Sequence, residues 1–137
     1  MELIYTARPS VQTVEFSKGL TINLNAPYGH DIEIVSLYTQ WACDATVATR
    51  HLDLKIWTGA DGTGSLLQYI FSTSPTASQS NSIQGPINTG GGSATFLTTV
   101  VSLVVPGSGS LHMEESSFVA GDTWSARVLY RIYPVYA

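Results

Sequence analysis

The chain has 137 residues, a length that favours one domain with a substantial core and excludes two domains of ordinary size. Apolar residues make up 44%, which excludes an intrinsically disordered chain. The formal net charge is −4, and the six Lys and Arg are scattered among ten Asp and Glu, so we expect no nucleic-acid partner.

The predicted elements are strands. Short runs rich in Val, Ile, Thr, Tyr and Trp alternate with Gly, Pro, Asn and Asp, and no window shows helical periodicity. Residues 1–19 are predicted to form an N-terminal arm with short edge strands, and residues 20–137 a single β-sandwich domain. The strands are expected at residues 3–6, 13–16, 20–24, 31–43, 50–57, 66–71, 80–83, 95–105, 111–113, 117–119 and 123–133.

Two strands show a clear alternation of apolar and polar residues. The strand at 50–57 places its three even-numbered aliphatic residues inward, and Lys55 and Trp57 outward. The last strand places Trp124 on its apolar face. The segment 59–64 is predicted to form a hairpin turn, because Asp-Gly readily supplies the positive φ that such turns need.

The middle of the chain carries no formal charge. Residues 62–113 contain no Asp, Glu, Lys or Arg, although soluble proteins average about 25% charged residues. Within this stretch, residues 72–94 are predicted to form a long loop rich in Ser, Thr and Gly. Monomers use charge to keep surfaces soluble and strand edges unpaired, so we expect neighbouring subunits to cover this part of the chain.

About eight principal strands without a helix predict an all-β fold, in which two antiparallel sheets form a sandwich. Eight strands favour a jelly roll with an N-terminal arm over an immunoglobulin-like sandwich. The single cysteine, Cys43, excludes both the paired-cysteine core of the immunoglobulin fold and any intrachain disulfide.

No catalytic signature is readable, so we predict that the protein is not an enzyme and has no catalytic, cofactor-binding or metal-binding residues. Cys43 could act as a nucleophile if His30 or His51 stood beside it. It ends an apolar strand, however, where a small buried residue is usual, and we interpret it as structural.

The histidines raise the question of a metal site. Each is close in sequence to a carboxylate: His30 to Asp31, His51 to Asp53, and His112 to Glu114. His51 and Asp53 share a strand face and could supply two ligands. A cupin-type site on a jelly roll would need further ligands, and the closely spaced His-x-His pair is missing, so a solvated face is the preferred interpretation.

Three further features have structural and functional interpretations. Residues 90–92 are three glycines, which we interpret as a flexible linker because no Lys-Ser/Thr pair or helix follows them as in a phosphate loop. Trp57 is outward and next to a turn, where it could stack on a sugar. Arg50 opens a strand after a loop and is expected to pair locally with an acid such as Asp44, as a structural clamp.

Three segments carry a resemblance to a known family. They are the long strand at 32–41, the run Asp44-Ala-Thr-Val-Ala-Thr-Arg50 before an alternating strand, and Ala120-Gly121-Asp122-Thr-Trp before the last strand. The chain resembles small jelly-roll structural proteins of tailed bacteriophages, which include capsid decoration (cement) proteins and neck or tail accessory subunits. The resemblance implies a non-enzymatic virion protein that contacts itself, with a trimer favoured, and the major capsid protein or other virion subunits.

The sequence also bears on location. The N-terminus lacks the basic start and apolar run of a signal peptide, and the longest apolar-leaning run is far shorter than the roughly 20 residues of a spanning helix. We therefore expect assembly in the host cytoplasm, a final location in the virion, and no membrane partner. The alternatives are a carbohydrate-binding or host-adhesion module of a tail or fibre and, ranked last, a metal-dependent enzyme of the cupin type.

Overall fold

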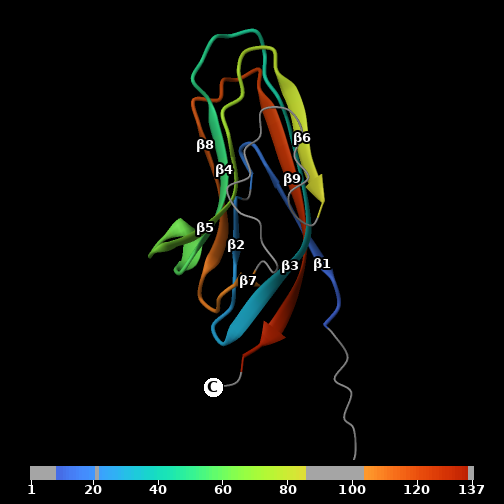
Figure 1. Ribbon diagram of the computed structural model, residues 1–137, viewed down its shortest axis with the longest axis vertical. Coiled ribbons are helices and arrows are strands. Elements are labelled where there is room, and N and C mark those ends of the chain that lie inside the picture. The colour runs from blue at the N-terminus through green and yellow to red at the C-terminus, as the bar shows by residue number, and fades with distance from the viewer. Residues whose placement is uncertain (1–8, 21, 86–103, 136–137) are drawn as a thin grey trace, which may run out of the picture.

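The computed structural model describes residues 9–20, 22–85 and 104–135, which form two antiparallel β-sheets packed face to face (Figure 1). The predicted all-β sandwich is therefore confirmed. The described strands are β1 (Gln12–Ser17), β2 (Asn23–Asn25), β3 (His30–Ala42), β4 (His51–Trp57), β5 (Leu66–Thr73), β6 (Ser80–Gly85), β7 (Val104–Val105), β8 (Ser110–Ser116) and β9 (Thr123–Pro134). A short 3-10 turn, η1 (Ala60–Gly62), lies between β4 and β5.

Each sheet joins strands that are far apart in the sequence. Sheet A has the order β1-β9-β3-β6, and sheet B has the order β2-β8-β4-β5. The long strand β3 pairs with β9 over most of its length, with one irregularity between Ile34 and Ser36. On its other side β3 pairs first with β7, opposite Ile32 and Glu33, and then with β6, opposite Leu37 to Ala42.

The core lies between the sheets. As the alternation predicts, Leu52, Leu54 and Ile56 of β4 point inward and are fully buried. Trp124 is in the core as predicted, directly across from Trp41 of β3. The edge strand β1 also contributes to this core. The other large buried residues are Phe16, Ile32, Phe71, Val105, Leu111, Met113 and Val128.

Most predicted strands coincide with observed ones to within a few residues, but the short strand predicted at 117–119 is wrong. Ser117 has a positive φ of 62°, and the Val119 N–H donates to Asp122 Oδ2 at 2.8 Å. These residues therefore form a turn that leads into β9. Nine strands are described rather than about eight, because the two-residue β7 pairs separately with β3.

The predicted loop and arm are covered only in part by the described residues. β5 continues to Thr73 and β6 begins at Ser80, so the described part of the loop at 72–94 includes the predicted strand at 80–83. The predicted strand at 3–6, the glycines at 90–92 and all but the last two residues of the strand at 95–105 lie outside the described residues.

The predicted hairpin between β4 and β5 is confirmed. Asp61 and Gly62 both adopt positive φ, at 55° and 70°. The turn is held against sheet B, because Asn25 Nδ2 donates to Asp61 Oδ1 at 2.9 Å and the Gly62 N–H donates to Ser110 Oγ at 2.9 Å. An added Cβ at Gly62 would lie 2.7 Å from the His112 ring, so the close fit depends on glycine.

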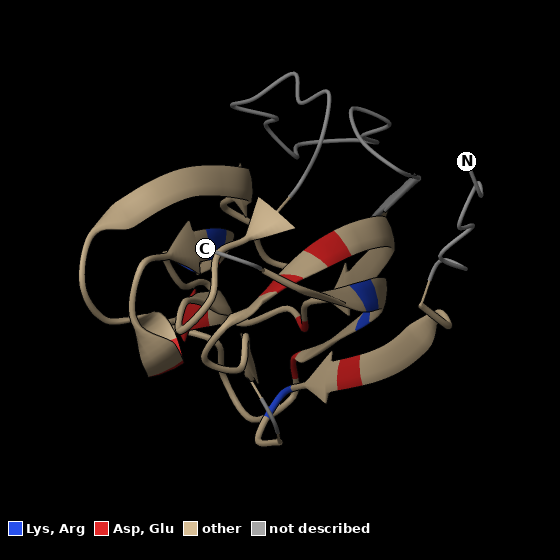
Figure 2. Cartoon of the chain, turned by 90° about the horizontal axis from the view of Figure 1, so that it is seen from below, with Lys and Arg blue, Asp and Glu red and all other residues tan. Residues whose placement is uncertain are grey.

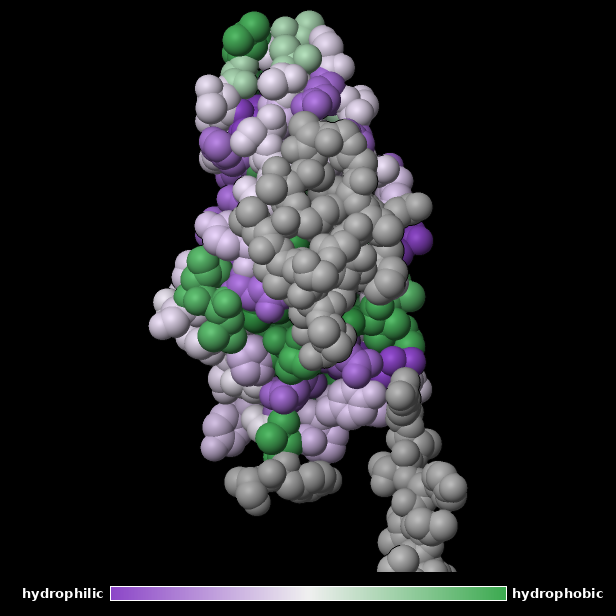
Figure 3. Space-filling view, viewed as in Figure 1, coloured by the Kyte–Doolittle hydropathy of each residue, from purple (hydrophilic) through white to green (hydrophobic). Residues whose placement is uncertain are grey.

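Charge is distributed unevenly over the strands. In Figure 2 the charged residues lie on some strands, while others are free of charge along their whole length. Two uncharged strands, β5 and β6, are edge strands of sheets B and A. On β5, Leu66 and Leu67 are 39% and 52% exposed, and Figure 3 shows hydrophobic side chains at the surface near the β4–β5 hairpin.

Candidate functional site

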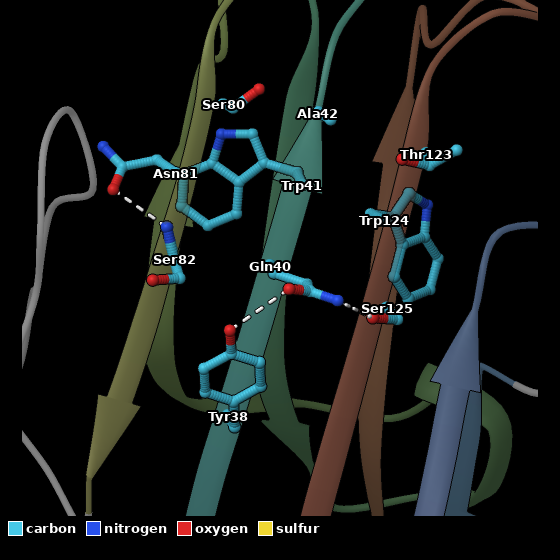
Figure 4. Close-up of a pocket in the computed structure, with 10 residues that line it drawn as sticks. All are labelled: Tyr38, Gln40, Trp41, Ala42, Ser80, Asn81, Ser82, Thr123, Trp124 and Ser125. Carbon is cyan, nitrogen blue, oxygen red and sulfur yellow. Dashed lines mark hydrogen bonds between the residues drawn. The ribbon is translucent and has the colours of Figure 1, made fainter.

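A groove runs across the outer face of sheet A (Figure 4). Strand alternation places Tyr38 and Gln40 of β3 on this face, and the antiparallel register brings Ser82 of β6 and Ser125 of β9 to either side of Gln40. The main hollow has a volume of about 520 Å³. Its lining residues are Tyr38, Gln40, Trp41, Ala42, Ser80, Asn81, Ser82, Thr123, Trp124 and Ser125.

A second hollow of about 300 Å³ continues the groove toward β1. It shares Tyr38, Gln40 and Ser125 with the first, so Tyr38 stands where the two hollows meet. Charge enters only at this second hollow, where Arg127 Nη2 and Glu15 Oε1 form an exposed ion pair at 3.0 Å. The main hollow is therefore lined by uncharged residues, and the second hollow is bordered by one ion pair whose two charges cancel.

Hydrogen bonds fix the centre of the groove. The Tyr38 hydroxyl donates to Gln40 Oε1 at 3.1 Å, and Gln40 Nε2 donates to Ser125 Oγ at 3.3 Å. Figure 4 shows Tyr38 and Gln40 one after the other along β3, with Gln40 reaching across to Ser125 on β9. These side chains can offer amide and hydroxyl groups to a ligand.

A buried ionic cluster lies near the end of β3 and joins the loops that precede β4 and β9. Arg50 is 1% exposed, and its Nε donates to Asp122 Oδ2 at 2.6 Å. Its Nη2 donates to Asp122 Oδ1 at 3.2 Å, to the Thr46 carbonyl at 2.8 Å and to Asp44 Oδ1 at 3.3 Å. The predicted pairing of Arg50 with Asp44 is confirmed, but Asp122 is the closer partner.

Asp122 joins several backbone segments through the same cluster. Its Oδ1 accepts the Asp44 N–H at 2.9 Å, and its Oδ2 accepts the Val119 N–H at 2.8 Å. The hydrogen bond from Arg50 lowers the pKa of Asp122 from 3.8 to about 2, against the opposing effect of burial, and the two backbone N–H groups add to the lowering. Gly121 allows the close approach, because an added Cβ would lie 2.2 Å from Asp44 Oδ2.

Lys55 forms a second cluster, on the outer face of sheet B. Its Nζ lies 2.6 Å from Glu114 Oε2 and 3.9 Å from Asp53 Oδ2, and it sits over the rings of Tyr69 and Trp57 at 5.0 and 5.8 Å. Burial of Lys55 acts to lower its pKa. The net pKa is nevertheless raised, mainly because Glu114 accepts a hydrogen bond from the ammonium group and carries a negative charge beside it. Lys55 is therefore outward, as the alternation predicts, yet buried.

Trp57, the sequence candidate for sugar stacking, is part of this same surface. Its side chain is half-buried, and its Nε1 is enclosed with no hydrogen-bond partner among the described residues. The ammonium group of Lys55 lies over its ring. This arrangement favours a packing role for Trp57 over an open platform.

Cys43 is buried, in agreement with its structural interpretation, and burial raises the pKa of its thiol. His30 Nδ1 lies 3.1 Å from the Tyr28 carbonyl, and His51 Nδ1 lies 3.0 Å from Ser74 Oγ. Both contacts are made with groups other than the thiol. In the described segments, the hydrogen bonds of His30 and His51 therefore do not involve the Cys43 thiol.

Members of the histidine–carboxylate pairs that are close in sequence also form contacts with other residues. Asp53 Oδ1 accepts from Ser72 Oγ at 2.5 Å, and Asp31 Oδ1 accepts the Gly107 N–H at 2.9 Å. His112 contacts Asn23 through Nδ1, and burial lowers its pKa. Among residues 9–20, 22–85 and 104–135, no group of three or more His, Cys, Asp and Glu side chains is arranged to hold a metal ion.

Comparisons with protein-family models, curated proteins and solved structures found no match to this chain. Within the described segments, no helix has the length and apolar character needed to cross a bilayer.

Proposed function

We propose that the chain is a non-enzymatic structural protein of a bacteriophage virion and serves as a capsid decoration (cement) subunit. In this role it contacts copies of itself, with a trimer favoured, and the major capsid protein or other virion subunits. It is assembled in the host cytoplasm, is located in the virion and needs no cofactor, nucleic acid or membrane. The observation that carries the proposal is that the two longest uncharged edge strands among the described residues, β5 and β6, lie at the edges of different sheets.

The strand order supports a jelly roll as the fold for this role. β1 pairs with β9, β2 with β8, β3 with β6 and β4 with β5, so the pairing runs from the two ends of the chain inward. This nested pairing results when one long antiparallel hairpin is rolled into two sheets. The short strand β7 pairs with β3 on the same side as β6 and extends that edge of sheet A. Jelly rolls occur in viral capsid and lectin domains.

The four sheet edges are protected to different degrees. Natural edge strands avoid pairing with other chains through charge, proline, short length or bulges. β1 carries Glu15 and β2 is three residues long, whereas β5 is irregular at two points of its pairing with β4 but exposes Leu66 and Leu67. β6 has six residues, no charge, no proline and an unbroken register with β3. An edge of this kind is tolerable where another subunit covers it.

Sedimentation velocity tests the assembly. We expect the native protein to form a homo-oligomer, and we expect Leu67→Lys to weaken association at least about tenfold, or about 1.4 kcal/mol, because a charge at the exposed β5 edge would be buried by a neighbour. Leu20→Lys is the matched control, since Leu20 is 73% exposed and lies outside β5 and β6.

Two outcomes would contradict the proposal. One is a native protein that stays monomeric at its highest soluble concentration and does not cosediment with empty phage capsids. The other is an oligomer that both lysine variants leave equally intact, because the β5 edge would then play no part in assembly.

A further inference from the structure

We propose that the groove on the outer face of sheet A binds a neutral oligosaccharide, with Tyr38 as the aromatic platform. This inference goes beyond the assembly role and does not depend on it. It also places the sugar on the opposite sheet from Trp57, the residue that the sequence favours for this chemistry.

The polar lining of the groove matches the chemistry of a sugar. The hydroxyl groups of Ser82 and Ser125 flank the amide of Gln40, so one short stretch offers both donors and acceptors. Sugar hydroxyl groups also donate and accept, and a recognition site for them needs both kinds of partner in alternation. The residues that line the main hollow carry no formal charge, which favours a neutral ligand over an acidic one.

Tyr38 supplies the apolar surface that a sugar also needs. It is 38% exposed and lies at the junction of the two hollows, where a ligand spanning both would pass over it. Aromatic side chains combine an apolar ring with a polar end, which suits the mixed faces of a sugar ring. In Figure 4 the ring is seen face on, beside the Gln40 amide.

The site is organised before any ligand arrives. The hydrogen bond from Tyr38 to Gln40 and the bond from Gln40 to Ser125 hold the platform and the amide in one orientation. A ligand therefore meets side chains whose freedom is already restricted, which reduces the entropy lost on binding. The volume of about 520 Å³ falls within the ordinary range for ligand pockets, and the adjoining hollow of about 300 Å³ lets a chain of sugars extend.

The test begins with the native protein on an array of neutral and acidic glycans, followed by calorimetric titration of the strongest neutral oligosaccharide. We expect binding to neutral glycans, with Tyr38→Ala weakening it at least about tenfold and Tyr38→Phe by only a few fold, since the ring remains. Tyr28→Ala is the matched control, because Tyr28 is 91% exposed and lines neither hollow of the groove. It should bind as the native protein does.

A second measurement uses the native protein alone, so its result does not depend on whether the variants fold. Amide chemical-shift changes on titrating the native protein with the same oligosaccharide should map to β3, β6 and β9. No binding to any neutral glycan, equal affinity of Tyr38→Ala and the native protein, or shifts confined to the Trp57 face would each overturn the inference. Absence of glycan binding by a native protein that still forms the oligomer would refute this site alone, because the assembly test uses the β5 edge.

Discussion

Replacing Asp122 by Asn tests the buried cluster that joins the loops before β4 and β9. The carboxylate accepts four hydrogen bonds: two from Arg50, one from the Asp44 N–H and one from the Val119 N–H. An amide has one acceptor oxygen, so two of these donors would face an NH₂ group. Removing one partner of a buried ion pair costs about 3–5 kcal/mol. Arg50 keeps its bonds to Asp44 and Thr46, so we expect a loss near 3 kcal/mol.

The pKa of Asp122 gives an independent magnitude. A fall from 3.8 to about 2 corresponds to roughly 2–3 kcal/mol, at about 1.36 kcal/mol per pH unit. Because the folded-state pKa is depressed, this stability is fully present above pH 3.8 and is lost as the pH falls toward about 2. The difference between native and Asp122→Asn proteins should therefore be largest near neutral pH and should shrink through that acidic window.

Urea unfolding, followed by the fluorescence of the buried Trp41 and Trp124, measures both effects. All samples should be compared at one protein concentration, because association adds to the apparent stability. Glu15→Gln is the control, since its ion pair with Arg127 is exposed and should contribute less than about 1 kcal/mol. A loss below about 1 kcal/mol for Asp122→Asn, or a difference that does not change with pH, would refute the reasoning.

Two further predictions concern the same end of the molecule. Gly121→Ala should destabilise the fold by roughly 1–3 kcal/mol, because its Cβ would displace the Asp44 carboxylate, and an unchanged urea midpoint would contradict this close fit. Cys43 should react much more slowly with a thiol reagent in the folded protein than in urea, because its thiol is buried and its pKa is raised. Equal labelling rates in the two states would show that the thiol is accessible.

The parts of the fold that were predictable from sequence are those set by local periodicity. The alternation in β4 identifies Leu52, Leu54 and Ile56 as core residues, and the Asp-Gly pair identifies the hairpin turn. The failure at 117–119 also has a local cause. Phe118 and Val119 favour a strand, but the carboxylate of Asp122 captures a backbone N–H and forms a turn.

The clusters and the groove depend on strand order, which local patterns do not encode. Arg50 and Asp122 are 72 positions apart, and Lys55 and Glu114 are 59 apart. The sequence shows Tyr38 and Gln40 as alternate residues on one face of a strand. Their polar neighbours lie on β6 and β9, however, and are set by the way these strands pair with β3. The sequence therefore points to Trp57, which stands beside a turn, and misses Tyr38, whose surroundings are assembled from three strands.

The arrangement of β6 and β7 along β3 has a consequence for protein engineering. β6 ends opposite Leu37, and β7 begins opposite Glu33, so the chain leaves and rejoins the same flank of one strand four residues apart. Strand β3 therefore sets the registers of both β6 and β7. A residue inserted into β3 or deleted from it between Glu33 and Leu37 would shift one register against the other, so engineering of this sheet has to keep that stretch at its present length.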